Sequence, residues 1–137
     1  MSKFDIVSAG IPFDKIAARH ETTSVAPAKL VEGYKADEDK PPFDLIPPLA
    51  LEAEAKVLGY GRRKYAAWNW AKGITTGRLI AAALRHIYQY LRGEDLDPES
   101  ELPHLAHASC MIHFALEQQL RGEKYAAYDD RFKWEEK

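Results

Sequence analysis

The amino-acid sequence predicts an all-α fold, a helical bundle of three to four helices with an extended N-terminal arm. Apolar residues recur at helical spacing from residue 48 onward, and prolines and glycines bound each periodic stretch. No alternation typical of a β-strand lasts more than a few residues. Because 137 residues suit one domain, we expect an arm over 1–40 and a helical domain over 41–137.

The arm lacks helical periodicity except over 13–19, where we expect a short helix. Residues 20–28 are rich in Thr, Ser, Ala and Pro, and 35–40 are almost entirely charged. A long segment of this kind is often functional or ordered by a neighbouring subunit. Three long helices with wide apolar faces also favour a core that is completed by a second copy. We therefore expect a homodimer or a homotetramer.

The first helix is expected over 48–65, with prolines in its first turn, where the missing N–H groups cost little. Thr75 or Thr76 can cap the second helix, and Gly93 follows its end. The second, third and fourth helices are expected over 75–92, from 98–103 to 121, and within 125–134.

Composition excludes several classes of protein. The formal net charge of −2 leaves no basic excess to neutralise a nucleic-acid polymer. The single cysteine, Cys110, excludes an internal disulfide, and its predicted burial in a helix argues against a nucleophilic role. The apolar runs are too short to cross a membrane, and the first residues lack the apolar stretch of a secretory signal. We expect a cytoplasmic protein.

A carboxylate lies in the apolar stripe of the first predicted helix. At 100° per residue, Glu54 lies among apolar residues, whereas Glu52 faces the opposite side with Lys56. Burying an unpaired carboxylate is costly, so Glu54 is expected either in a buried salt bridge or as a metal ligand.

The second helix has a predicted core stripe and a basic edge. His86 lies between them, as a hydrogen-bonded core residue or as a ligand. The basic edge is either a solvated face or a clamp for phosphates. The stripe comprises Ile80, Leu84, Ile87 and Leu91, and the edge comprises Arg78, Arg85 and Arg92.

Two histidines lie one turn apart on the third helix. His104 and His107 share a face, so both can reach one metal ion or one phosphate. The preceding loop contains Asp95 and Asp97, which either bind Mg²⁺ or favour the helix N-terminus. His113 falls on the far side of the helix and is expected to be structural.

Six separated blocks of sequence resemble one bacteriophage family in the same order. They are K-P-P-F-D-L-I-P-P (40–48), E-A-K-V-L (54–58), G-R-R-K-Y (61–65), N-W-A-K-G (69–73), R-H (85–86) and G-E-D-L-D-P-E-S-E-L-P-H-L-A-H-A (93–108). The family is described as the N-terminal region of dATP/dGTP diphosphohydrolases. Glu101 stands where the family usually has glycine.

The resemblance implies hydrolysis of a purine deoxynucleoside triphosphate, dGTP or dATP, to the monophosphate and pyrophosphate. It also suggests a relation to the all-α pyrophosphohydrolases of the MazG type, which use Mg²⁺ or Mn²⁺. His104 and His107 occupy what looks like the E-x-x-D metal-binding slot of those enzymes. A histidine pair there favours a softer ion such as Zn²⁺, unless the pair binds phosphate and Asp95 or Asp97 binds the metal.

The leading hypothesis is a metal-dependent nucleoside triphosphate pyrophosphohydrolase, with Glu54, Asp97 and His104 as its catalytic residues. The predicted metal ligands are Glu54, Asp95, Asp97, His104 and His107. The predicted substrate-binding residues are Lys40, Lys64, Asn69, Trp70, Arg85 and His86, with Trp68 as an alternative stacking residue. Two other hypotheses stay open: a His-Asp-type phosphohydrolase that uses His86, Asp97, His104 and His107, and a non-catalytic nucleotide-binding module.

Overall fold

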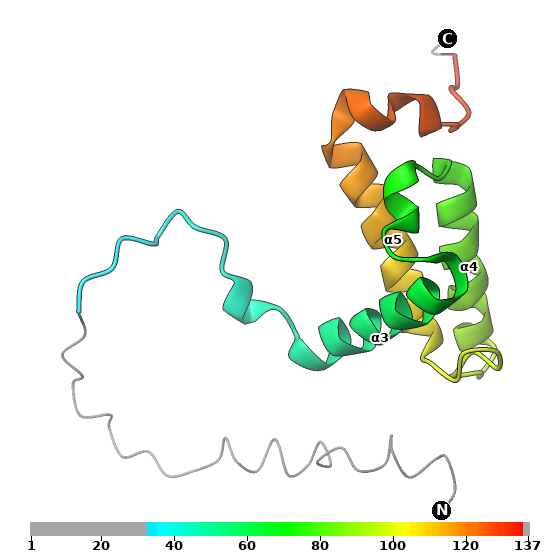
Figure 1. Cartoon of the computed structure of the whole chain (residues 1–137), viewed down its shortest axis with the longest axis horizontal. Helices are drawn as coiled ribbons and strands as arrows, with labels where there is room; N and C mark the ends of the chain where they lie inside the picture. The colour runs from blue at the N-terminus through cyan, green and yellow to red at the C-terminus, as the bar shows by residue number, and fades with distance from the viewer. Residues whose placement is uncertain (1–32, 136–137) are drawn as a thin grey trace, which may run out of the picture. The chain divides into compact units, whose positions relative to one another are not determined.

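The helical prediction is confirmed by a computed structural model, which describes residues 33–135. The chain divides into two compact units, 1–40 and 41–137. Figure 1 shows the second unit as three α-helices with shorter 3-10 turns. Its elements are η1 (Phe43–Leu45), α3 (Pro48–Tyr65), η2 (Asn69–Lys72), α4 (Thr76–Leu91), α5 (His104–Leu120) and η3 (Gly122–Tyr128). The helix expected over 13–19 lies outside the described residues.

The boundaries predicted for the three long helices agree closely with the structure. α3 ends at Tyr65, because the next residue, Ala66, has a φ of 78° that cannot continue a right-handed helix. Thr75 does precede α4, but its hydroxyl makes no capping hydrogen bond. The fourth helix is shorter than expected, because η3 ends at Tyr128.

The core lies where α5 packs between α3 and α4. Val57, Ala106 and Cys110 form its centre, and Leu79 and Ala83 bring α4 against α5. The predicted α4 core stripe is therefore wrong, because its leucines and Ile80 are exposed on this single chain. The face of α4 that packs on α5 is the one that carries Leu79 and Ala83, so the residues of the predicted stripe lie nearer the solvent.

The C-terminal turns hold the segment between α3 and α4 in place. The side-chain amide of Gln118 donates to the carbonyl of Ile74 and accepts from its N–H, both at 2.9 Å. The hydroxyls of Tyr125 and Tyr128 donate to the carbonyls of Ala71 and Lys72 at 2.8 Å. These bonds hold η2, which contains Trp70, against α5 and η3.

Replacing Gln118 with leucine should lower the free energy of unfolding by about 1–3 kcal/mol, because both polar groups of Ile74 lose their partner in a half-buried place. Urea denaturation followed by circular dichroism measures the change. Gln119→Leu is the matched control, since Gln119 is exposed on the next position of α5. Equal stability of the two variants would contradict the assignment.

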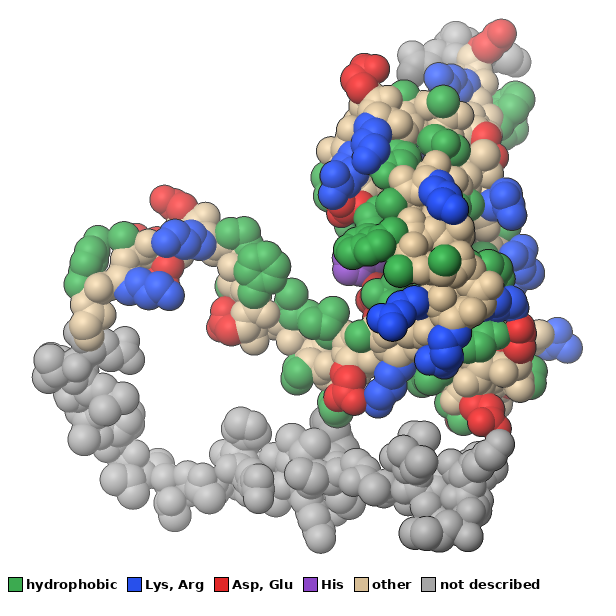
Figure 2. Space-filling view, viewed as in Figure 1, with side chains coloured by type: hydrophobic (Ala, Val, Ile, Leu, Met, Phe, Trp, Pro, Cys, Tyr) green, Lys and Arg blue, Asp and Glu red, His purple; other side chains and the backbone are tan. Residues whose placement is uncertain are grey.

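The surface of the helical unit is mixed in charge. Figure 2 shows Lys and Arg side chains spread over the visible face and interleaved with acidic and hydrophobic ones. Among the described residues, none of the helices combines the length and the apolar character that crossing a bilayer demands.

Candidate metal centre

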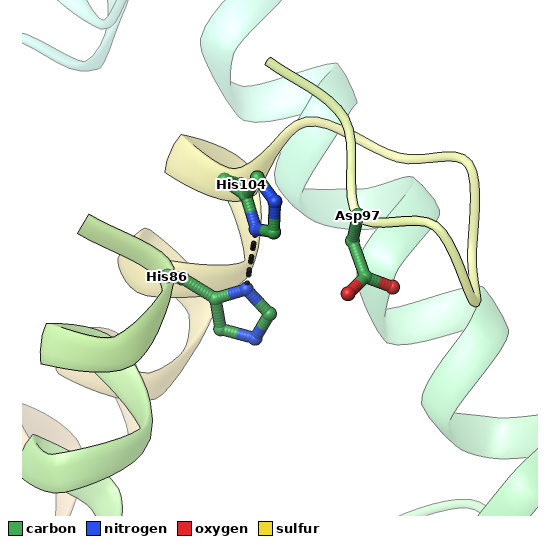
Figure 3. A group of neighbouring side chains, drawn as sticks. All are labelled: His86, Asp97 and His104. Atoms are coloured by element: carbon green, nitrogen blue, oxygen red, sulfur yellow. Dashed lines mark hydrogen bonds between the residues drawn. The ribbon is translucent and has the colours of Figure 1, made fainter. Parts of the chain in front are cut away.

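Three side chains from separate segments converge beside the start of α5. His86 comes from α4, His104 is the first residue of α5, and Asp97 comes from the loop between them (Figure 3). Each offers one nitrogen or oxygen atom, and these atoms all lie within 4.8 Å of one another. His104 is almost completely buried, and the other two are partly buried. The spacing of these atoms allows one metal ion to contact all three side chains.

The hydrogen bonds of the two histidines define which nitrogens carry protons. His104 Nε2 lies 2.9 Å from a carboxylate oxygen of Glu94, which can only accept, so this nitrogen is the donor. In a neutral His104, Nδ1 then holds a lone pair and accepts from His86 Nδ1 at 2.8 Å. His86 Nε2 consequently holds a lone pair as well. Both rings thus keep an unprotonated nitrogen, as metal ligation requires.

Asp97 is held by the residues around it. Ser100 donates to the Asp97 carboxylate through both its N–H and its hydroxyl, each at 2.8 Å. The Ser100 oxygen in turn lies 2.6 Å from His107 Nε2, and because its own proton goes to Asp97 it accepts from His107. His107 stacks on the His86 ring at a centroid distance of 4.5 Å. Ser100 and His107 therefore position both Asp97 and His86.

The loop that carries Asp97 is tied back on itself. The N–H of Asp97 donates to the carbonyl of Leu102, and the N–H of His104 donates to the carbonyl of Asp95. Glu101 adopts a φ of 58°, a left-handed conformation that glycine reaches without strain. This is the position where the family that the sequence resembles usually has glycine.

The surroundings favour neutral imidazoles and an ionised carboxylate. Burial, and then the neighbouring His107 and His104, lower the pKa of His86. Burial also lowers the pKa of His107. Burial alone would raise the pKa of Asp97, but the hydrogen bonds from Ser100 outweigh it, and the net pKa is lowered. His86 and Asp97 are therefore in the protonation state of metal ligands at neutral pH.

Acidification should destabilise the folded chain below about pH 6.5. Unfolded histidines bind protons near that pH, whereas His86 and His107 have lowered pKa values in the folded state, so the unfolded state takes up more protons. The melting temperature in EDTA should fall between pH 7.5 and pH 5.5. The contribution of Asp97, whose lowered pKa starts from 3.8, is lost only at still lower pH. His86→Gln should reduce the fall, and a flat profile in the unsubstituted protein would contradict this reasoning.

The donor set suits a transition metal better than Mg²⁺. Two imidazole nitrogens and one carboxylate fit Zn²⁺ or Mn²⁺, whereas Mg²⁺ prefers an all-oxygen shell. The bond from His104 Nε2 to Glu94 is the kind of outer contact that orients a metal-binding histidine. Chemistry and protonation state of the residues therefore both fit a bound divalent ion.

Glu54 has other neighbours than the His86 group. Its carboxylate is buried and accepts hydrogen bonds from the Ser109 hydroxyl at 2.8 Å and from His113 Nδ1 at 2.7 Å. The predicted burial of Glu54 is confirmed, but neither an Arg nor a Lys pairs with it among the described residues, and it is not in the His86 group. His113, expected to be structural, has a side chain that is 60% exposed.

The charge of Glu54 also affects the pKa of the Cys110 thiol. Burial, and then the Glu54 charge, raise the pKa of the Cys110 thiol to about 12. The thiol stays protonated at neutral pH, which agrees with the expectation that it is not a nucleophile.

The remaining predicted residues are more scattered. Lys64 donates to Glu99 at 2.5 Å, and this bond raises the pKa of Lys64. The side chains of Asp95 and Arg85 are exposed, and neither belongs to the His86 group. Lys40 is exposed and belongs to the other unit. Asn69 and Trp70 form part of η2, where Trp70 stacks on Phe114 at 5.5 Å.

Three contributing residues were not singled out from the sequence as part of a site, namely Glu94, Ser109 and His113. For Glu94 a signal existed, since it lies in the acidic loop before His104. For Ser109 and His113 the only signal was their spacing of four on one helix.

The family model described as "dATP/dGTP diphosphohydrolase, N-terminal" matches residues 31–131. The chain belongs to this family. The matched range of the dATP/dGTP diphosphohydrolase N-terminal family includes His86, Asp97, His104 and His107. It also includes Glu54 and both tryptophans of the loop before α4.

One curated relative is a dATP/dGTP diphosphohydrolase of Salmonella phage PMBT28, which is 39% identical over 82 residues. The aligned part is 60% of this chain and 28% of the relative, so this family member spans well under a third of that protein. No solved structure matches the chain.

Proposed function

We propose that this chain is a metal-dependent hydrolase domain for purine deoxynucleoside triphosphates, with His86, Asp97 and His104 as the metal ligands. The convergence of these three residues carries the proposal. A bound divalent ion would supply a water of lowered pKa and charge to balance the phosphate oxygens. The name of the phage relative supports the substrate class.

The chain's own residues prepare the centre. Glu94 holds the orientation of His104 by accepting its Nε2 proton. Ser100, backed by His107, fixes the carboxylate of Asp97. Tyr60 of α3 meets the His107 ring in an edge-on arrangement, with the two ring centroids 6.2 Å apart. These contacts hold the ligands in place before any ion binds, which lowers the cost of ordering them.

We propose pyrophosphate and a deoxynucleoside monophosphate as the products, in keeping with the word diphosphohydrolase in the relative's name. A second candidate is a His-Asp-type phosphohydrolase that releases triphosphate or inorganic phosphate. The absence of Glu54 from the described metal group favours this candidate, because His86, Asp97, His104 and His107 are the residues it would use.

Chromatography of the products separates these possibilities. The purified chain is incubated with each of the four dNTPs in the presence of Mn²⁺, Mg²⁺ or Zn²⁺. Monophosphate with pyrophosphate supports the proposal, and a nucleoside with triphosphate supports the second candidate. No turnover with any metal, together with thermal stabilisation by dGTP, indicates a non-catalytic nucleotide-binding module.

We further propose that the chain acts as a homodimer or homotetramer in the cytoplasm. The apolar side chains that α4 and α5 expose on a single chain support self-association, because water contact with them is unfavourable. Light scattering coupled to gel filtration measures the mass. A monomer at micromolar concentration would refute the oligomer.

A further inference from the structure

A cavity of about 380 Å³ opens beside Glu54, outside the metal group. Its polar lining comprises Glu54 of α3, His113 and Glu117 of α5, and Arg121 directly after α5, where Glu117 and Arg121 form an ion pair. Its aromatic lining comprises Trp68, Trp70 and Phe114, and leucine and alanine side chains of α3 complete it. A buried carboxylate thus faces an aromatic pocket that is large enough for one heterocyclic base.

The aromatic lining includes a ring that is exposed at a strained backbone position. The side chain of Trp68 is 73% exposed, and its φ of 61° lies in the left-handed region. That conformation costs roughly 1–2 kcal/mol for a residue with a Cβ. Trp70 lies beside it at 6.1 Å and is itself backed by Phe114. Strain of this kind is concentrated at binding sites, and the exposed ring is free to stack on a ligand.

The Glu54 carboxylate determines which ligand the pocket accepts. One oxygen already accepts from His113 and the other from Ser109, and each keeps a further lone pair. The carboxylate therefore offers two adjacent acceptors and no donor. It matches a planar ring with two adjacent N–H donors on one edge.

Guanine has this edge, with N1–H beside the exocyclic N2–H. Adenine and cytosine instead place a ring nitrogen lone pair beside their amino group, and this lone pair would repel the carboxylate. We infer that this cavity binds the guanine base, with Trp68 stacking on the ring and Glu54 accepting N1–H and N2–H. This inference rests on the proposed function only in taking a nucleotide as the ligand.

Calorimetric titration in EDTA with dGMP, dAMP, dCMP and dTMP tests this pocket without metal or turnover. We expect dGMP to bind at least tenfold more tightly than the others, because the other bases leave the buried Glu54 carboxylate unmatched. Glu54→Gln should weaken dGMP binding tenfold or more, because the amide keeps only one acceptor. It should not weaken dAMP binding, because it removes the charge that repels the adenine lone pair. The matched control is Glu52→Gln, two residues away on α3, exposed and paired with Lys56.

Trp68→Ala provides a second variant if Glu54→Gln does not fold, since the Trp68 ring is mostly exposed. It should weaken the binding of every nucleotide by roughly tenfold, because each base loses its stacking partner. Equal binding of all four nucleotides, no binding, or unchanged dGMP affinity in both variants would overturn the inference. If the chain hydrolyses dGTP but does not bind dGMP selectively, the guanine pocket is wrong and the proposed metal centre stands. If it binds dGMP selectively but hydrolyses no dNTP, the guanine pocket stands and the proposed hydrolase function is wrong.

Discussion

Asp97→Asn should lower the rate of metal-dependent dNTP hydrolysis at least 100-fold and weaken Mn²⁺ or Zn²⁺ binding to a similar extent. The substitution keeps the shape of the side chain, and the amide oxygen can still accept from Ser100. It removes the negative charge of the carboxylate, which would bind the proposed ion together with the nitrogens of His86 and His104. Metal affinity is measured by calorimetry, and turnover by chromatography of the products.

Asp95→Asn is the informative comparison, because the sequence left open which acid of the loop binds the metal. The Asp95 side chain is exposed and lies outside the His86 group, whereas its backbone carbonyl accepts from His104. We expect Asp95→Asn to bind metal and turn over substrate within about threefold of the unsubstituted protein, roughly 0.6 kcal/mol by the rate relation. If Asp95→Asn were the inactive variant and Asp97→Asn the active one, the ligand assignment would be wrong.

His104→Ala should have the largest effect on the free energy of unfolding, a loss of about 2–4 kcal/mol in the absence of metal. The imidazole is 2% exposed, and both of its nitrogens are hydrogen bonded. Its removal leaves a cavity, and it also leaves Glu94 and His86 without their partner. Urea denaturation in EDTA measures the loss.

The neighbouring Leu105→Ala is the control for helix α5, because Leu105 is about half exposed and should cost less than about 1 kcal/mol. The same titration with Mn²⁺ or Zn²⁺ present adds a second readout. The ion should stabilise the unsubstituted protein and Leu105→Ala, but not His104→Ala. Equal stabilisation of all three proteins would place the metal elsewhere.

The burial of Glu54 shows how far sequence reasoning reaches into the site. Its place in an apolar stripe follows from the helical period alone, and the structure confirms that the carboxylate is buried. Its partners do not follow from the period, because Ser109 and His113 lie more than 50 residues away. The sequence left two interpretations of Glu54 open, a salt bridge with Arg or Lys and a metal ligand. Neither interpretation included a hydrogen bond to a histidine.

The register of α3 on α5 separates Glu54 from the paired histidines. Tyr60 meets His107, whereas Glu54, six residues earlier on α3, meets His113, six residues later on α5. The two helices therefore run in opposite directions. With a rise of 1.5 Å per residue, six residues correspond to about 9 Å along the helix, too far for one ion to contact both groups.

By itself the sequence determined the helix boundaries, the inward position of Glu54 and the shared face of His104 and His107. These features depend on hydrogen bonds and side-chain spacing within a turn or two of one helix. Only the tertiary structure decided that His86 joins His104, that Asp97 rather than Asp95 meets them, and that Glu54 faces the tryptophans. These outcomes depend on the rotation and register of separate helices, which packing of the whole core selects and no local pattern encodes.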